Sequence, residues 1–541
     1  MVYYVDEAPI VATNKVQNAV EQITKWTERW CVTINQEKSS TTFFTLSGKQ
    51  AGTIKMGNTP LKTDDQPTYL GVTFDKKLTW KNQLKNAETK ARRKLALMRK
   101  LCGTDWGANE RILKNTYVQG VRPHMEYASS AWSSASNTGL QTLDRVQNQA
   151  LRIITGGMRS TPIKQMEKIT GIQSLKERRD TKIIQQAQKY LCTQDSAMKG
   201  RMKDLARGRL KRSSFVHQAK RLRKGLKDMP QNFLPLTYVP EQTPWEEPNT
   251  CIEIRKTVPG VQSKKEQSDV EKRTAAMATI EDSYPEEAWT RVYTDGSATN
   301  ATQNGGAGIY IQYPNAERDT ISIPTGVHCS NYEAEACAII EAATHLAEKT
   351  PQTNQVVFLT DALSVLQASE NGKLSKLTTA LGQLNYLRIV LQWIPSHCKI
   401  PGNEKADSLA KQGAEKMQPD RPITFQELKR IVKHKRKPPN EPPDHYHQLD
   451  RKGQTIIFRL RTRHNRLNYH MYNKFKIGNS ADCDCGHGQQ TTEHVLQECT
   501  QLQETRNKYW PAEHTMERKL YGPLVELQKT VDYILDSGLS M

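Results

Sequence analysis

"RVYTDGSATN", residues 291–300, places a carboxylate directly after a short alternating run. Arg291 to Thr294 alternates like a β-strand, and Asp295 and Gly296 follow at once. An Asp-Gly pair is by itself a common hairpin turn, because both residues tolerate positive φ. A further role for Asp295 therefore depends on whether the fold brings other carboxylates to it.

Residues 288–416 alternate strands with helices around this stretch. NGGAGIYIQY (304–313) and DTISIP (319–324) predict a second and a third strand, which complete an antiparallel meander. NYEAEACAIIEAATHLAEK (331–349) predicts an amphipathic helix. QVVFLT (355–360) and RIVLQWIP (388–395) are apolar strands that lead towards helices, which favours parallel pairing. We therefore expect an α/β domain with a mixed five-stranded sheet.

Four carboxylates lie at the junctions of these elements. Asp295 and Asp361 follow strands, whereas Glu335 and Asp407 lie early in helices. Four like charges repel one another, and a pair of divalent cations resolves this repulsion. Mg²⁺ prefers such oxygen ligands, and two ions about 3.5–4 Å apart promote phosphoryl hydrolysis. His397, in a loop before Asp407, is a candidate proton shuttle.

Residues 291–416 resemble a type 1 ribonuclease H. The motifs that carry the resemblance are TDGS (294–297), YEAEACAIIEA (332–342), LTDALSVL (359–366) and SHCKIPGNEKAD (396–407). The resemblance implies that the RNA strand of RNA–DNA hybrids is hydrolysed by an endonuclease domain at 288–418. It also implies two Mg²⁺ ions, replaceable by Mn²⁺. The implied catalytic residues are Asp295, Glu335, Asp361 and Asp407 as metal ligands, and His397 as the loop histidine.

Two details qualify this assignment. Glu333 competes with Glu335 for the helix ligand, but the run Ala-Ile-Ile-Glu-Ala after Ala336-Cys337 sets the register on Glu335. Residues 371–387 are too few for the extra basic helix with which some members of the family hold the hybrid. We therefore expect other basic parts of the chain to hold the nucleic acid.

Residues 1–200 read as mixed and then mainly α, and they resemble the post-palm, thumb-like part of a non-LTR retrotransposon reverse transcriptase. The matching stretches are WTERWCVTINQEKSSTTFF (26–44), TYLGVTFDKKLTW (68–80), GVRPHMEYASSAW (120–132) and LDRVQNQALRIITG (143–156). The resemblance implies a truncated polymerase whose catalytic motif precedes Met1. YVDE (4–7) is superficially similar to that catalytic motif, but we interpret Asp6 and Glu7 as surface acids.

The composition is strongly cationic, with a net charge of +21 and a pI near 9.4 over 541 residues. Phosphate backbone is the usual partner of such a chain. No apolar run approaches the ~20 residues of a membrane helix, and the N-terminus lacks the pattern of a secretory signal. The ten cysteines are mostly single, which favours reduced thiols in an intracellular compartment, of which the nucleus is one.

Residues 201–287 are predicted to connect two folded regions. The basic run at 199–228 contains few acids, which favours nucleic-acid contact over a solvated helix face. Prolines recur between Met229 and Glu287, and we expect a linker without regular structure there.

Residues 419–541 are predicted to be a basic helical region with a Cys/His cluster. Cys483, Cys485, His494 and Cys499 suit a tetrahedral Zn²⁺ site, although His487 is a rival ligand and three free thiols are the alternative. The Arg-rich stretch 459–466 is expected to contact phosphates.

The favoured function is a metal-dependent endonuclease that acts on RNA–DNA hybrids. The alternative, from a different functional class, is a catalytically inactive retroelement relic that binds nucleic acid. A third interpretation is an RNA-directed DNA polymerase, but this sequence lacks the palm aspartates that such an activity requires.

Overall fold

The computed structural model describes residues 1–46, 48–193, 197–203, 214–226, 229–236, 252–261, 267–349, 353–384, 386, 388–436, 444–512 and 514–541. The chain forms two compact units. The first consists of Met1–Ile183, Arg207–Gln218 and Pro438–Met541, and the second of Ile184–Ala206 and Ala219–Lys437. None of the helices in the described part of the chain is long and apolar enough to cross a membrane.

The first unit is mainly helical, as predicted for the N-terminal region. Its longer helices are α1 (Pro9–Arg29), α2 (Lys81–Arg99), α5 (Asn137–Thr155), α16 (Arg451–Thr462) and α20 (Leu524–Asp536). Shorter ones are α3 (Glu110–Thr116), α4 (Arg122–Glu126), α6 (Ile163–Thr170), α17 (Asn468–His470), α18 (Gln503–Tyr509) and α19 (Met516–Tyr521). Helix α7 (Leu175–Cys192) contains the boundary between the units.

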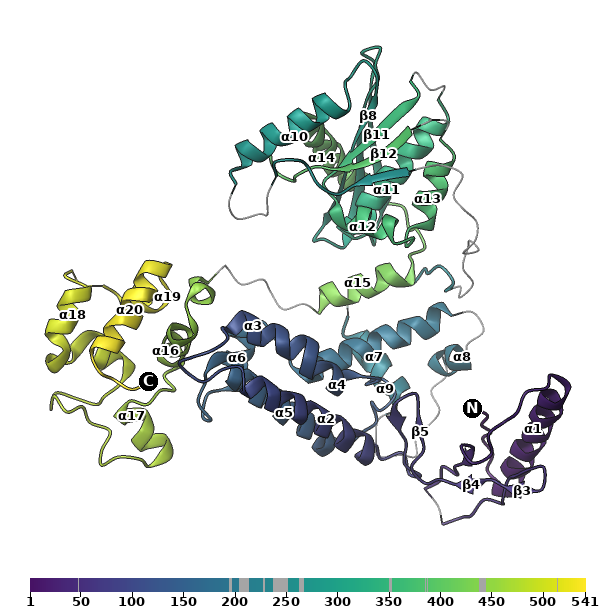
Figure 1. Ribbon diagram of the computed structural model, residues 1–541, viewed down its shortest axis with the longest axis horizontal. Helices are drawn as coiled ribbons and strands as arrows, with labels where there is room; N and C mark the ends of the chain where they lie inside the picture. Colours follow the sequence, from purple (N-terminus) through teal and green to yellow (C-terminus); the bar gives the residue numbers. More distant parts are fainter. Residues whose placement is uncertain are drawn as a thin grey trace. The chain divides into compact units, whose positions relative to one another are not determined.

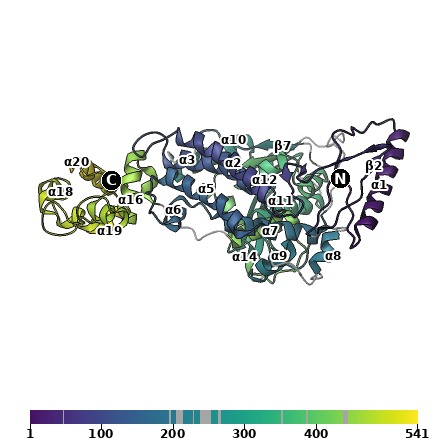
Figure 2. The same cartoon turned by 90° about the horizontal axis from the view of Figure 1, so that it is seen from below.

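The strands of the first unit are only two residues long. They are β1 (Ser40–Thr41), β2 (Lys55–Met56), β3 (Thr59–Pro60), β4 (Lys62–Thr63), β5 (Thr68–Tyr69) and β6 (Val72–Thr73). The helices α2 and α5 lie side by side (Figure 1, Figure 2). Helix α5 ends where Gly156 adopts a φ of 69°, as the Gly156-Gly157 pair in the sequence indicates.

One apolar core joins the two ends of the chain within this unit. Leu143, Leu151 and Ile154 of α5 share a buried cluster with Phe458 of α16 and Val531 of α20. The guanidinium of Arg451 donates to the backbone carbonyls of Ile153 (2.7 Å) and Ile154 (2.5 Å). Residues from 444 onwards therefore complete the core that the N-terminal helices begin.

The phosphate-binding expectation for residues 459–466 is wrong for its first two arginines. Arg459 is 5 % exposed and donates to the carbonyl of Gly156 at 2.8 Å. Arg461 pairs with Asp444 and lies over the ring of Tyr521. Both guanidinium groups are satisfied inside the protein, because backbone carbonyls and a carboxylate take the place of phosphate.

The second unit contains a six-stranded mixed sheet in the order β10-β9-β8-β11-β12-β7. The strands are β7 (Ile252–Arg255), β8 (Thr290–Thr299), β9 (Gln303–Gln312), β10 (Arg318–Gly326), β11 (Gln355–Thr360) and β12 (Arg388–Trp393). Strands β8, β9 and β10 pair antiparallel, and β8, β11, β12 and β7 pair parallel. The five predicted strands are all present, with the predicted directions.

The sixth strand corrects the prediction that 229–287 lacks regular structure. Strand β7 pairs with β12, and α10 (Asp269–Ser283) follows it. Ser268 and Glu271 form a capping box at the start of α10. Ala276 and Ile280 of this helix are buried against the sheet. Prolines 240, 244 and 248, also part of the predicted linker, lie outside the described residues.

Helices cover both faces of this sheet (Figure 1). One face packs against α11 (Asn331–Ala347), α12 (Leu363–Glu370) and α13 (Ser375–Gly382). The other packs against α10 and α14 (Pro401–Glu415). Three further helices belong wholly or largely to this unit, namely α8 (Ala197–Lys203), α9 (Phe215–Lys224) and α15 (Phe425–Lys435).

Glycines in β9 allow α14 to approach the sheet closely. A Cβ on Gly306 would lie 2.0 Å from the carbonyl oxygen of Ala410, and one on Gly308 would lie 2.0 Å from that of Ala406. No side chain fits at either place. The glycines thus set the position of α14, which carries Asp407.

Candidate active site

Asp295 lies inside a strand and not at its end. Strand β8 continues to Thr299, and the turn comes at Asn300 and Ala301, which both have positive φ. The expectation that Asp295 follows the end of the strand is therefore wrong, because β9 pairs with β8 as far as Thr299. Asp295 itself pairs in register with Gly308.

The structure brings three of the predicted carboxylates together. Asp295 comes from β8, Glu335 from the second turn of α11, and Asp361 from the first position after β11. One carboxylate oxygen of each lies within 4.8 Å of the other two. Because β8 and β11 are adjacent parallel strands, their side chains meet at the same edge of the sheet, where α11 begins.

Burial and mutual repulsion keep these groups from ionising freely. Burial, and next the charge of Asp361, raises the pKa of Asp295 to about 8. Burial and the charge of Asp295 raise the pKa of Glu335 well above its ordinary value. The pKa of Asp361 is also raised by burial, against the opposing effect of His397. Ionising all three carboxyl groups together therefore costs electrostatic free energy, and a bound cation would remove this cost.

The donor set fits divalent metal ions. The Oε2 atom of Glu335 is buried and, among the described residues, has no hydrogen-bond partner. Leaving a buried carboxylate oxygen unpaired is costly, and a cation is its natural partner. Carboxylate oxygens are the ligands that Mg²⁺ prefers in proteins.

Asp407 and His397 lie at the margin of this cluster. Asp407 is half-buried on α14 and pairs with Lys411 one turn later. Its charge contributes to the raised pKa of Asp295, so the two carboxylates are near each other. His397 is exposed, has a φ of 57°, and lowers the pKa of Asp361 by its positive charge.

Two residues near Asp361 were not predicted from the sequence. The side-chain amide of Asn403 hydrogen-bonds Asp361 and lowers its pKa, and the Oδ1 atom of Asn403 is buried without a partner among the described residues. The indole of Trp393 donates to the backbone carbonyl of Asp361 at 3.2 Å. Asn403 lies within SHCKIPGNEKAD (396–407), the segment that also carries His397 and Asp407, and this position was its only signal.

The C-terminal Cys/His residues also converge. Ligand atoms of Cys483, Cys485, His494 and Cys499 lie within 4.8 Å of one another. The imidazole of His494 is buried, with its Nε2 3.2 Å from the Cys485 sulfur. His487 is exposed and turns its Nδ1 to the carbonyl of Cys485 at 2.7 Å. The geometry thus selects His494 over His487.

This cluster has the chemistry of a zinc site. The backbone N–H of His487 lowers the pKa of Cys485 to about 6, so its thiolate forms readily. Glu498 lies 3.5 Å from the Nδ1 of His494, where a carboxylate orients a ligand imidazole. Three thiols and one imidazole are a donor set that structural Zn²⁺ uses.

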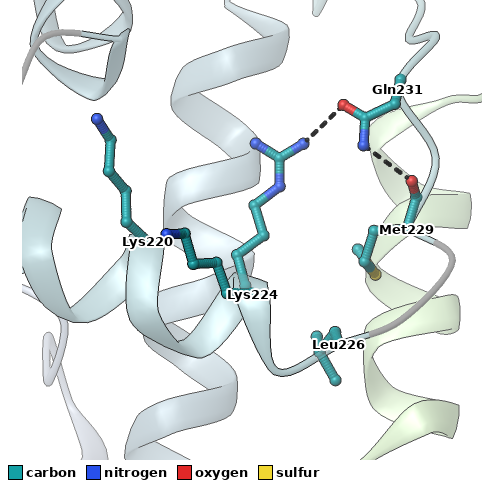
Figure 3. A pocket seen from close by; sticks show the side chains of 6 residues that line it. Lys220, Lys224, Leu226, Met229 and Gln231 are labelled. Carbon is teal, nitrogen blue, oxygen red and sulfur yellow. Dashed lines mark hydrogen bonds between the residues drawn. The ribbon is translucent and has the colours of Figure 1, made fainter.

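The described part of the basic run lines a shallow cavity of about 430 Å³. Its lining residues are Lys220, Arg223, Lys224, Leu226, Met229 and Gln231 (Figure 3). Among these described residues there are three cations and no carboxylate. The guanidinium of Arg223 donates only weakly to Gln231, at 3.4 Å. Residues 204–213 and 227–228 of the run lie outside the described residues.

Asp6 has a local structural role, as expected for a surface acid. Its carboxylate accepts from the backbone N–H of Ala8 and pairs with Lys15, both at 3.1 Å. Neither Asp6 nor Glu7 belongs to a metal-ligand cluster of the described residues.

Comparison with family models identifies one region of the chain. Residues 287–415 match the family model described as RNase H. Among curated proteins, the chain is 26 % identical over 145 residues to the probable RNA-directed DNA polymerase from transposon X-element of Drosophila melanogaster. It is 27 % identical over 148 residues to the RNA-directed DNA polymerase from mobile element jockey of the same organism. Each alignment covers 27 % of this chain and only 16 % of the relative.

Solved structures also match about a quarter of the chain. RNase H1 from the halophilic archaeon Halobacterium salinarum is 16 % identical, with a TM-score of 0.21, over 24 % of this chain and 98 % of its own. LC11-RNase H1 in complex with an RNA/DNA hybrid is 18 % identical, with a TM-score of 0.20, over 23 % of this chain and 96 % of its own.

Proposed function

We propose that the RNase H domain of this retrotransposon polyprotein, residues 287–415, hydrolyses the RNA strand of RNA–DNA hybrids. The observation that carries the proposal is the buried group formed by Asp295, Glu335 and Asp361, whose ligand oxygens lie within 4.8 Å of one another. The Oε2 atom of Glu335 has no hydrogen-bond partner among the residues that the structure describes, so a bound cation would stabilise this buried oxygen.

The residues of the site have distinct roles in this proposal. Asp295, Glu335 and Asp361 would hold divalent cations, and Asp407 would add a ligand on the exposed side. Such ions would supply activation of the attacking water and charge stabilisation of the leaving oxygen. His397 transfers a proton at its imidazole, and Asn403 orients Asp361 through its amide.

Nucleic acid is the proposed partner, and basic residues outside the domain assist its binding. The cavity is lined by three basic side chains, those of Lys220, Arg223 and Lys224. The described residues between 371 and 386 form one short helix, α13, so this cavity is a candidate for holding the hybrid's backbone.

The test is cleavage by the full chain of three labelled substrates with Mg²⁺: an RNA–DNA hybrid, a DNA duplex and an RNA duplex. Selective cutting of the RNA strand, lost in Asp295→Asn, supports the proposal, because the 2′-hydroxyl distinguishes RNA from DNA. Equal cutting of all three substrates contradicts it. No cutting by folded protein favours the alternative, an inactive nucleic-acid-binding relic.

We also propose that Cys483, Cys485, His494 and Cys499 hold one structural Zn²⁺ ion. The observation behind this is the convergence of four soft ligands on one point, with the rival His487 directed elsewhere. Elemental analysis of protein purified without chelators tests it, and the absence of zinc contradicts it.

A further inference from the structure

The helix that carries Glu335 begins with half of a capping box. Ser330 is the N-cap of α11, and its Oγ accepts from the backbone N–H of Glu333 at 3.3 Å. In a complete box, the side chain of Glu333 would accept from the backbone N–H of Ser330. That N–H instead donates to the Oε1 atom of Glu427, at 2.6 Å.

Glu427 thus supplies the second half of the box from another helix. Its Oε2 accepts from the Ser330 hydroxyl at 3.0 Å and from Arg430 at 3.1 Å. The residue is only 1 % exposed. A carboxylate at the N-terminus of a helix is favoured by the helix dipole, and more strongly so when it is buried. The side chain of Glu333 does not take part in the capping box. Its Oε2 atom lies 3.9 Å from the Nη1 atom of Arg430.

Helix α15 holds Glu427 rigidly in this place. Thr424 caps the helix by accepting from the backbone N–H of Glu427 at 3.1 Å. Leu428, Ile431 and Val432 are buried in a separate apolar cluster with Met229. The guanidinium of Arg430 also stacks 3.8 Å from the ring centre of Tyr332, in the first turn of α11.

This contact reaches the carboxylate cluster through one turn of helix. Glu335 lies two residues after Glu333, and its backbone nitrogen faces Gly296 of β8 at a distance that would exclude a Cβ. The start of α11 is therefore fixed by β8 on one side and by α15 on the other.

We propose that Glu427 is a positioning residue for the metal centre, acting through Ser330 on the helix that presents Glu335. The inference rests on the proposed function. Glu427 lies beyond residues 287–415, the region that matches the RNase H family model. Helix α15 accordingly belongs to the working catalytic unit.

Glu427→Ala in the full chain tests the inference by two measurements. Hydrogen exchange of peptides covering residues 328–337 should become about 10-fold faster or more, because a hydrogen bond to a charged group is lost. The dissociation constant for Mg²⁺, measured by calorimetry, should rise about 10–100-fold, as is typical when a group that supports a metal ligand is removed.

Two variants serve as controls. Glu427→Gln keeps an oxygen for the Ser330 N–H, so both effects should be smaller. Gln426→Ala, an exposed position on the same helix, should change neither.

Three results would overturn the inference. The first is unchanged exchange or unchanged Mg²⁺ affinity in Glu427→Ala. The second is an equal rise in exchange throughout the sheet, which would indicate general destabilisation. The third is the same local effect in Glu333→Ala, which would show that the local box holds the helix. If the wild type neither binds Mg²⁺ nor cleaves hybrid, the proposed function fails, and the exchange measurement alone decides whether Glu427 holds α11.

Discussion

A Cβ atom on Gly296 would lie 2.2 Å from the backbone nitrogen of Glu335. This contact places Glu335 of α11 against the strand that carries Asp295, and only glycine permits it. Gly296 matters for the approach of α11 and not for a turn, since β8 continues past it.

Gly296→Ala should therefore displace the start of α11 and reduce cleavage by about 100-fold, because displacing a catalytic group by about 1 Å has effects of this size. Initial rates on labelled hybrid measure the loss. Gly200→Ala is the control, since a Cβ there meets nothing within 4 Å. Near-normal activity in Gly296→Ala would show that Glu335 does not need this position.

Asp295→Asn should abolish cleavage and yet stabilise the metal-free protein. The pKa of Asp295 is raised to about 8 in the folded state, from an ordinary 3.8. The stability that goes with its neutral form is complete below the ordinary value and is lost as pH rises through about 8. An amide does not ionise, so the gain in Tm should grow between pH 4 and pH 8.

Thermal unfolding in buffer without divalent cations measures this gain. Asp282→Asn, an exposed residue of α10, is the matched control and should show no such pH trend. A fall in Tm for Asp295→Asn at pH 8 would contradict the repulsion within the cluster.

His397→Ala should slow cleavage by about 10²–10⁴-fold without abolishing it, which is the usual contribution of proton transfer. The imidazole is exposed and lies outside the group of three convergent ligands. Single-turnover rates across pH should lose one limb of the profile. A variant as inactive as Asp361→Asn would make His397 a ligand or a structural residue.

Removal of the proposed Zn²⁺ ion should destabilise the whole first unit. Val495 and Leu496, which follow His494, are buried in the same cluster as Leu151 of α5. In a unit of this size, each ~1 kcal/mol lost lowers Tm by about 2–4 °C. Hydrogen exchange after chelation should therefore rise in α5 as well as in residues 483–499.

Cys485→Ser should reproduce the effect of chelation, whereas His487→Ala should not, because His487 points away from the other ligands. An exchange increase confined to residues 483–499 would show that the cluster folds separately from the helices.

Lys224→Gln should flatten the salt dependence of hybrid binding. A phosphate contact contributes about 0.9 to the slope of log affinity against log salt on duplex DNA, and the variant should lose up to that amount. Lys433→Gln, an exposed lysine on α15, has the same charge change and should leave the slope unchanged. Equal slopes for Lys224→Gln and the wild type would make the cavity a solvated surface.

The carboxylates of the candidate site could be predicted from the sequence better than the elements that pack around them, strand β7 and helix α10. The alternation in Arg291–Thr294 and the apolar run 355–360 are local patterns, so β8, β11 and their carboxylates could be assigned. Strand β7 has four residues between prolines, too few for a periodic signal. Helix α10 did carry signals, namely the Ser268 and Glu271 box and the stripe at Ala276 and Ile280.

Two other features could not be predicted because their partners are remote in sequence. Ser330 and Glu427 are 97 residues apart, and Ser330 already has a local candidate in Glu333. Arg459 does not face solvent as a phosphate-binding residue would. Its guanidinium donates instead to the carbonyl of Gly156, which lies 303 residues earlier. A charge pattern in the sequence shows where basic side chains occur. Whether such a side chain is buried or exposed depends on the tertiary fold.

The shared core of α5, α16 and α20 also determines when this protein can fold during its synthesis. Helix α5 leaves the ribosome roughly 300 residues before α16, so at about 5–20 residues per second the helix waits about 15–60 s for its partner. The carbonyls of Ile153 and Ile154 that Arg451 later satisfies remain open during this interval. The second unit ends at Lys437 and its described strands lie within residues 252–393, so its chain is synthesised before α16 is made. Order of synthesis thus makes the second unit the earlier-folding part of the chain, whereas the core around α5 is completed only after α16 and α20 have been made.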